Sequence, residues 1–309
     1  MDKAAAVAQI IAPIFAAILL GMLARKKALL TPEENRGLQQ FVIQFGMPCV
    51  VFNACLTADI NREVLSSMAL VLPLVLLGTL WAFRWGRKWF PYHNMPMLFA
   101  AQETGMLGIP LFIMLFGADQ AYRMGVLDLT QAVVAYPVIA ILTSVSGENP
   151  SVSGILKKMF TSPLLLMSLL GLALNLSGVG RLLDDIGIGS ILTGCTAFLA
   201  QPVSAVMIFS VGYHFSLEKG SRGPVFRLCG VHFGMFAVFC LIIQGVLLLI
   251  PGVEAMTRWA ILLYCALPAS YLAPGLGRSE EDYTVASGVC SMLTIACLAV
   301  FCCIAAVVS

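Results

Sequence analysis

Charged residues are scarce in this sequence of 309 residues: they make up 11% of it, whereas hydrophobic residues make up 60%. The mean hydropathy is +0.93. A soluble protein with so few charges could not cover its surface with polar groups. The scarcity argues against cytosolic enzymes, nucleic-acid binders and secreted disulfide scaffolds, and it indicates a chain that is solvated by lipid.

The motifs of soluble enzymes are also missing. The sequence has no P-loop, no dinucleotide glycine fingerprint, no HExxH, no nucleophile elbow and no CxxC. Its ten cysteines lie in or at the ends of apolar runs without zinc-site spacing, and we interpret them as small membrane hydrophobes. We therefore expect no catalytic residue, no cofactor and no metal.

What the sequence does have is a succession of apolar runs separated by short polar breaks. A helix needs roughly 20 apolar residues to cross the hydrocarbon core. The first run lacks a signal-peptide cleavage site and is interpreted as a true span. The runs lie at 5–24, 37–56, 64–83, 95–116, 124–146, 161–178, 189–213, 225–250, 257–276 and 283–309. They predict an all-α polytopic membrane protein with ten transmembrane helices.

The chain also divides into two halves with matching prolines. Residues 1–146 and 161–309 hold five spans each, and 147–160 is the predicted cytoplasmic linker. Pro48 matches Pro202 at an offset of 154, and Pro110 matches Pro268 at an offset of 158. Because five is odd, the second half must enter the membrane in the opposite orientation, which is the inverted repeat typical of secondary transporters.

Spans 4 and 9 carry the strongest signs of interrupted helices. They read GMLGIPLF and CALPASYLAPGLG, with proline and glycine inside apolar stretches. Proline removes a backbone donor, and glycine permits unwound backbone. A single proline is read as an ordinary kink, but matched interruptions in two halves point to a midplane substrate site around Pro110 and Pro268.

Basic residues predict the orientation. Thirteen of the eighteen lie in the loops between spans 1 and 2, 3 and 4, 5 and 6, 7 and 8, and 9 and 10, including Arg84 to Lys88. The positive-inside rule places these loops in the cytoplasm and both termini outside. The expected location is the plasma membrane.

Only two of the sixteen acidic residues, Glu103 and Asp128, fall within spans, and an acid in lipid is a functional hypothesis by default. Glu103 lies about 12 Å into span 4, near the predicted midplane. Loss of solvation favours its neutral form, so it is the candidate for proton coupling. The alternatives are a structural hydrogen-bonded acid or an ionised one that faces a cation. Asp128 is also explained as a first-turn helix acid.

Uncharged polar residues near the interruptions form a second candidate set for lining the site, although each could simply join two helices. Three others, His232, Gln244 and Asn175, lie away from the interruptions and are interpreted as structural. The candidate set is Asn53, Gln102, Gln131, Gln201, Ser270 and Tyr271.

Across the whole chain these residues resemble the auxin efflux carrier family of bacterial permeases, whose plant relatives are the auxin carriers. The resemblance rests on GMPCVVFN at 46–53, GMLGIPL at 105–111, LKKMFTSPLLLMSLLGLALNLSG at 156–178 and ALPASY at 266–271. It implies ten helices in a scaffold and a transport domain, and broken helices 4 and 9 that cross near midmembrane. It also implies carriage of organic anions.

By the same resemblance, Asn53, Asp128 and the segments around Pro110 and Pro268 lie near the site. This chain departs from the family pattern at two positions, where Glu103 and Leu272 stand in place of asparagine. The leading function is therefore a secondary carrier of a small organic anion, with the solute, membrane lipid and an optional second copy of the chain as partners, and no nucleic acid. The alternatives, in order, are a ligand sensor without net transport, a channel and an intramembrane enzyme.

Overall fold

The computed structural model describes residues 3–57, 62–144, 161–215 and 222–308. The predicted linker at 147–160 lies outside the described residues. All regular structure in these four ranges is helical, apart from one isolated antiparallel bridge between Gln102 and Ala269. The all-α prediction is confirmed for this part of the chain.

Most of the structure is α-helix, with short π- and 3-10-helical stretches at several ends. The elements are α1 (Lys3–Lys26), α2 (Pro32–Phe41), η1 (Val42–Gly46), α3 (Met47–Leu56), α4 (Arg62–Trp81), η2 (Ala82–Gly86), α5 (Arg87–Trp89), α6 (Met97–Ala100), η3 (Thr104–Gly108), α7 (Ile109–Phe116), η4 (Ala118–Gln120), α8 (Ala121–Ser144), α10 (Pro163–Leu176), α11 (Val179–Asp185), α12 (Ile188–Ala200), α13 (Val203–His214), α14 (Arg222–Leu249), α15 (Ala255–Ala266), η6 (Pro274–Leu276) and α16 (Glu280–Val308).

Within the described ranges, six helical stretches are long and apolar enough to cross a membrane: Ala8–Lys26, Pro32–Leu56, Ser66–Trp89, Ile188–His214, Arg222–Leu249 and Glu280–Val308. Three shorter apolar helices accompany them, Thr104–Phe116, Pro163–Leu176 and Ala255–Ala266. The large apolar side chains that remain exposed, such as Leu241 at 73% and Leu249 at 83%, suit contact with lipid. The chain is a multi-pass helical membrane protein, and the count of ten spans stays a prediction.

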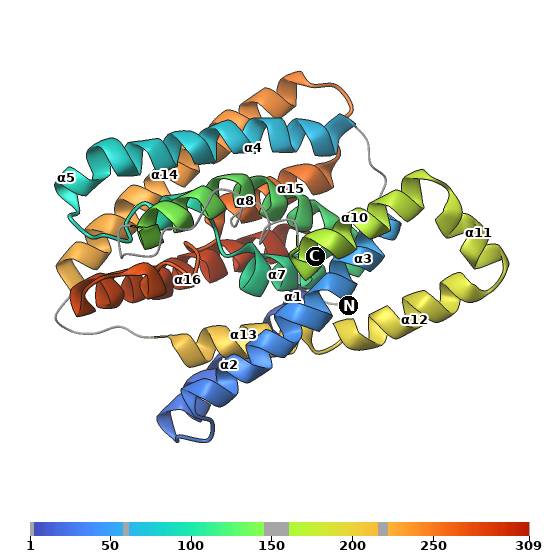
Figure 1. The fold of residues 1–309 in the computed structure, drawn as a ribbon, viewed down its shortest axis with the longest axis horizontal. Coiled ribbons are helices and arrows are strands. Elements are labelled where there is room, and N and C mark those ends of the chain that lie inside the picture. Colours follow the sequence, from blue (N-terminus) through green and yellow to red (C-terminus); the bar gives the residue numbers. More distant parts are fainter. Residues whose placement is uncertain (1–2, 58–61, 145–160, 216–221, 309) are drawn as a thin grey trace.

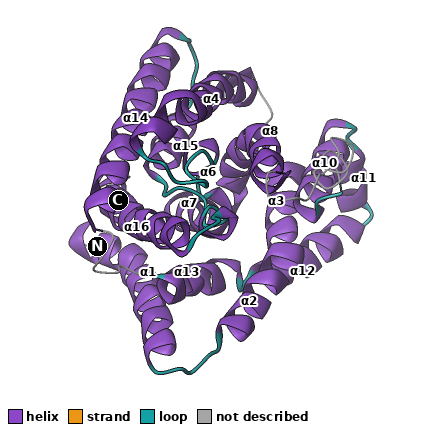
Figure 2. Ribbon diagram, turned by 60° about the vertical axis from the view of Figure 1, so that its left-hand side comes forward, coloured by secondary structure: helices purple, strands orange, loops and turns teal. Residues whose placement is uncertain are grey.

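Helices from distant parts of the chain pack side by side. In one group α1 packs against α13, and α3 packs against α10 and α12. In the other group α4 packs against α8, and α14 packs against α15 and α16. Figure 1 shows α10, α11 and α12 together beside α3, whereas α4, α14 and α16 lie on the other side. In Figure 2, loops gather between α6, α7 and α15, in the interior of the second group.

Glycines bring α1 and α13 into backbone contact. A Cβ atom added at Gly21 would lie 2.0 Å from the carbonyl oxygen of Phe209, and one at Gly212 would lie 2.1 Å from that of Ile18. Small residues allow such close approach of helices in lipid, where van der Waals packing holds helices together. Any side chain here would force the two helices apart.

The third helical stretch is longer than its predicted span. We expected Arg84 to Lys88 to form a loop, but η2 and α5 continue the helix to Trp89. This prediction was wrong because the Arg87 guanidinium finds local partners: it lies 5.1 Å from the centre of the Phe83 ring and donates to the carbonyl of His93 at 2.8 Å. The turn falls at 90–96 instead.

The matched prolines mark two kinds of interruption. Pro48 follows the π-helical η1, and Pro202 lies between α12 and α13. These two places touch, because a Cβ at Gly46 would lie 2.7 Å from Val203 Cγ2. The other interruptions are complete breaks, at residues 101–103 between α6 and η3, and at residues 267–273 between α15 and η6.

Candidate functional site

The two unwound segments, 101–103 and 267–273, pair with each other in a short antiparallel arrangement, which we call the crossing. The backbone N–H of Glu103 donates to the carbonyl of Pro268 at 2.8 Å, and that of Ser270 donates to the carbonyl of Ala101 at 3.0 Å. Buried backbone groups need partners, and an unwound segment has lost its intrahelical ones. Each segment therefore supplies what the other lacks.

The side chain of Gln131 on α8 satisfies the free edge of this backbone. Its Oε1 accepts from the N–H of Gln102 at 2.7 Å, and its Nε2 donates to the carbonyl of Gln102 at 2.8 Å. The same Oε1 accepts from the Tyr264 hydroxyl at 3.0 Å. Gln131 thus replaces the hydrogen bonds of the interrupted helix, and it is only 3% exposed.

The carboxylate of Glu103 joins the two segments from within. Its Oε1 accepts from the N–H of Met106 at 3.2 Å, in the first turn of the helix that restarts at Thr104. Its Oε2 accepts from the N–H of Tyr271 at 2.7 Å, on the other unwound segment. The residue is 8% exposed, and none of the ion pairs between described residues involves it.

Asp128 lies beside this arrangement on α8. Its Oδ1 accepts a short hydrogen bond from the Thr104 hydroxyl and another, of 3.0 Å, from Gln131 Nε2. Because α8 begins at Ala121, Asp128 is two turns into the helix. The reading of Asp128 as a first-turn acid was wrong, since the helix starts earlier than the apolar run that predicted it.

Seven of the nine predicted site residues gather at the crossing: Gln102, Glu103, Asp128, Gln131, Pro268, Ser270 and Tyr271. Ser270 is 6% exposed, and its Oγ accepts from the N–H of Leu272 at 3.3 Å. The hydroxyl of Tyr271 meets that of Thr294 on α16 at 2.6 Å. The crossing is therefore bound to α8 on one side and to α16 on the other.

Two predicted residues and one further candidate lie elsewhere. Asn53 accepts from the Thr196 hydroxyl at 2.6 Å, between α3 and α12, and Gln201 is exposed between α12 and α13. Pro110 lies in α7, seven positions after the break, where the π-helical η3 accommodates its missing N–H.

Sequence reasoning missed two residues at the crossing and misjudged a third. Thr104 and Tyr264 join the polar network, yet neither hydroxyl stands out in an apolar run. His232 on α14, interpreted as structural, reaches the side-chain amide of Gln102 at 3.4 Å and is 1% exposed. That amide also faces the carbonyls of the other segment, to which its nitrogen can donate. A lone ionisable residue inside a span was the available signal for His232.

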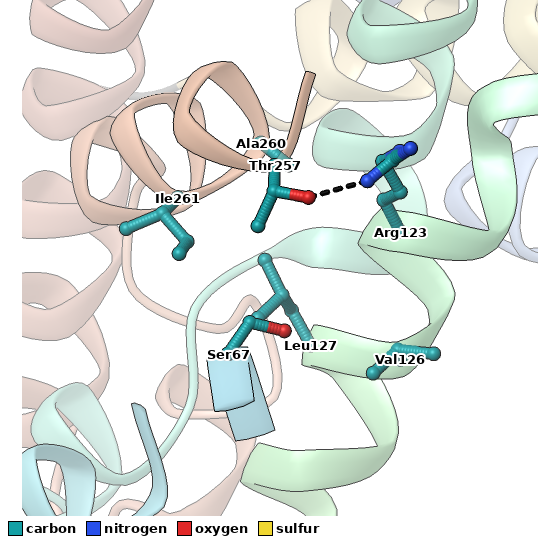
Figure 3. Close-up of a pocket in the computed structure, with 7 residues that line it drawn as sticks. All are labelled: Ser67, Arg123, Val126, Leu127, Thr257, Ala260 and Ile261. Atoms are coloured by element: carbon teal, nitrogen blue, oxygen red, sulfur yellow. Dashed lines mark hydrogen bonds between the residues drawn. The ribbon is translucent and has the colours of Figure 1, made fainter. Parts of the chain in front are cut away.

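A small pocket lies between α4, α8 and α15 and includes none of the residues of the crossing (Figure 3). The Arg123 guanidinium, 7% exposed, donates to the hydroxyl of Thr257 there, as the dashed line in Figure 3 marks. It also pairs with Glu254 and donates to Gln120 Oε1 at 3.0 Å, so its charge is engaged locally. The pocket is lined by Ser67, Arg123, Val126, Leu127, Thr257, Ala260 and Ile261.

The polar groups of the crossing are of the kinds that form hydrogen bonds with polar solutes. The crossing combines backbone N–H groups, carboxylates and amides in a buried place, and backbone dipoles at interrupted helices are suited to charged groups. Among the described residues, no group of three or more His, Cys, Asp and Glu side chains is arranged to hold a metal ion. The groups present are hydrogen-bond donors and acceptors and two carboxylic acids, Glu103 and Asp128.

Comparison with known proteins gives one informative likeness. No family model matches the chain. A protein of Methanothermobacter thermautotrophicus, named an uncharacterized transporter, is 25% identical over 285 residues, which cover 90% of each chain. Together with the apolar helices, this likeness supports a membrane transporter.

Proposed function

We propose that the chain is a secondary active transporter that carries a small organic anion, a carboxylate or an auxin-like acid, across the plasma membrane by alternating access. The observation that carries this proposal is the crossing, where the backbone N–H groups of two interrupted helices bond to each other's carbonyls and to the side chains of Gln131 and Glu103. Interrupted helices are a recurrent way to bind charged solutes within a membrane.

The packing of the helices supports an inverted repeat in this proposal. Spans 1 and 7 pack together as α1 and α13, and their counterparts, spans 6 and 2, do so as α10 and α3. Spans 3 and 5 pack as α4 and α8, and spans 8 and 10 repeat this as α14 and α16. Contacts related by exchange of the two halves are what a two-fold pseudosymmetry requires.

The same packing suggests which parts move. We assign α1, α2, α3, α10, α12 and α13 to the scaffold, and the helices around the crossing to the transport domain. The ends of α1 and α5 and the start of α14, which are rich in basic residues, lie toward one end of the molecule in Figure 1. This arrangement suits a cytoplasmic face there and termini outside. Membership in the auxin efflux carrier family belongs to the proposal and rests on the motifs quoted above.

Glu103 supplies the proposed coupling to protons. Ionised, it repels an anionic solute from the crossing; neutral, it donates a hydrogen bond to one. Solute binding then favours the protonated carrier, and by linkage the proton and the anion travel together.

Uptake into proteoliposomes tests the function. The purified chain is reconstituted and offered a panel of labelled monocarboxylates, dicarboxylates and indole carboxylates at two internal and external pH values. We expect uphill accumulation of at least one acid when the side of entry is acidic. Binding without accumulation would favour a sensor, and flux that never exceeds equilibrium and does not saturate would favour a channel.

A further inference from the structure

Two backbone N–H groups from distant parts of the chain converge on a single carboxylate at the crossing. Met106 donates to one oxygen of Glu103 and Tyr271 donates to the other. Met106 lies in the first turn of a helix of 13 residues, Thr104–Phe116, where N–H groups have no intrahelical partner. Such a pair of donors is complementary to any carboxylate, and here the chain's own carboxylate fills it.

Among the described residues, the charge of Glu103 has backbone N–H groups and no basic side chain as its hydrogen-bond partners. The described titratable groups that face the crossing are Asp128 on α8, Tyr264 on α15, Tyr271 at the second break, Cys290 on α16 and, through Gln102, His232 on α14. None of these is a lysine or an arginine. A buried carboxylate held only by hydrogen bonds is released more easily than one held by a buried counter-charge.

The pair of donors is approachable from one side. A Cβ atom at Gly105 would meet only Met47 Cε, at 3.9 Å, and Gly105 and Met106 are half-buried. On the other segment Leu272, next to Tyr271, is 61% exposed. A small ligand therefore has space beside the carboxylate that it would replace.

We propose that Glu103 is an internal ligand: its carboxylate occupies the Met106 and Tyr271 N–H groups in the empty carrier, and the carboxylate of the transported anion displaces it. This inference rests on the proposed function. It makes Glu103 a specificity-determining residue. The two N–H groups bind one carboxylate at a time, so the Glu103 side chain must move away from them when the solute binds. It also explains how the crossing can bind an anionic solute although it contains an acidic residue.

The test uses the 309-residue chain in detergent, with formate as the probe. The thermal unfolding temperature of the protein is measured as a function of formate concentration at constant ionic strength. The variant Glu103→Ala empties the donors without adding bulk. We expect formate to raise its unfolding temperature in a saturable way, with an apparent Kd at least tenfold lower than that of the wild type. Formamide, the neutral isostere, should have no such effect, and Asp119→Ala, which removes an exposed acid, should behave like the wild type.

Two results would overturn the inference: a folded Glu103→Ala that gains no preference for formate, or a wild type that binds formate equally well. If Glu103→Ala does not fold, Glu103→Gln keeps the size but has no charge and accepts only one of the two hydrogen bonds, because its amide nitrogen is a donor and meets the other N–H group. Its apparent Kd for formate should fall below that of the wild type, and an unchanged value would contradict displacement. If the chain takes up carboxylates but formate does not stabilise the Glu103 variants, the inference is rejected and the proposed function stands. If formate stabilises them but no acid is taken up, the proposed function is rejected, and with it the displacement of Glu103 by a transported solute.

Discussion

The N–H of Tyr271 donates to the Glu103 carboxylate at 2.7 Å, so one side chain joins two unwound segments that lie 168 positions apart. This contact makes the protonation state of Glu103 a property of the whole crossing. A neutral acid accepts hydrogen bonds more weakly than a carboxylate, and therefore each protonation loosens the joint between the two segments.

The first prediction concerns proton coupling. Glu103→Gln imitates the neutral acid but cannot release a proton. We expect it to keep solute binding, to lose the pH dependence of binding, and to lose proton-driven accumulation. Counterflow, which exchanges solute without net proton movement, should persist. A variant with wild-type pH dependence and accumulation eliminates Glu103 as the coupling residue.

Local features of the sequence predicted the interruptions well. Proline and glycine change the backbone wherever they stand, so the matched segments of spans 4 and 9 signal their breaks without knowledge of the fold. The exact limits depended on partners instead. The first break lies at 101–103, before Pro110, because Gln131 and the second segment offer hydrogen bonds there.

The composition of the site was predicted less well, because it depends on how each helix is rotated about its axis. Asn53 and Asp128 look equally polar in their spans, yet Asn53 faces Thr196 on α12, whereas Asp128 faces Thr104 at the crossing. His232 was misjudged for a related reason. It lies 130 positions from Gln102, and only the packing of α14 brings the two together.

The second prediction concerns Gln131. In Gln131→Leu the N–H and carbonyl of Gln102 lose their partners, which costs roughly 1–3 kcal/mol for each buried group. We expect a lower unfolding temperature and at least tenfold slower transport per folded molecule. Gln244→Leu is the matched control, since Gln244 donates to the Arg258 carbonyl at 2.8 Å, away from the crossing. Equal transport by both variants would show that Gln131 does not hold the crossing in shape.

The third prediction separates the two prolines. Pro268 lies within the second break and its carbonyl accepts from Glu103, whereas Pro110 lies inside α7. Pro268→Ala lets α15 extend and should weaken transport much more than it lowers the yield of folded protein. Pro110→Ala should have a smaller effect, within about threefold. Transport rates normalised to folded protein decide the matter, and equal rates for wild type and Pro268→Ala would reduce Pro268 to an ordinary kink.

The fourth prediction concerns the contact between α1 and α13. Gly212→Leu places a side chain against the backbone of Ile18, which cannot move aside as a flexible side chain can. Overpacking of this kind costs typically 1–3 kcal/mol, so the unfolding temperature should fall. Gly234→Leu on α14 is the control, because a Cβ there meets nothing within 4 Å. Similar unfolding temperatures for the two variants would contradict the close approach.

The last prediction is topological, and the structure changes where its probe belongs. Residues 84–88 are helical, so the reporter cysteine is placed at Pro91, an exposed position in the turn between α5 and α6. We expect a membrane-impermeant thiol reagent to label Pro91→Cys from the cytoplasmic side only, above the background of the ten native cysteines. Of these, Cys195 and Cys303 are exposed, so the reporter cysteine is introduced into a variant that carries both Cys195→Ser and Cys303→Ser. Tags at the two termini should both be reachable from outside, because an even number of spans returns the chain to the side where it started and the basic residues predict that this side is outside. Termini on opposite sides would contradict ten spans, and labelling of Pro91→Cys from outside would reverse the orientation that the basic residues predict.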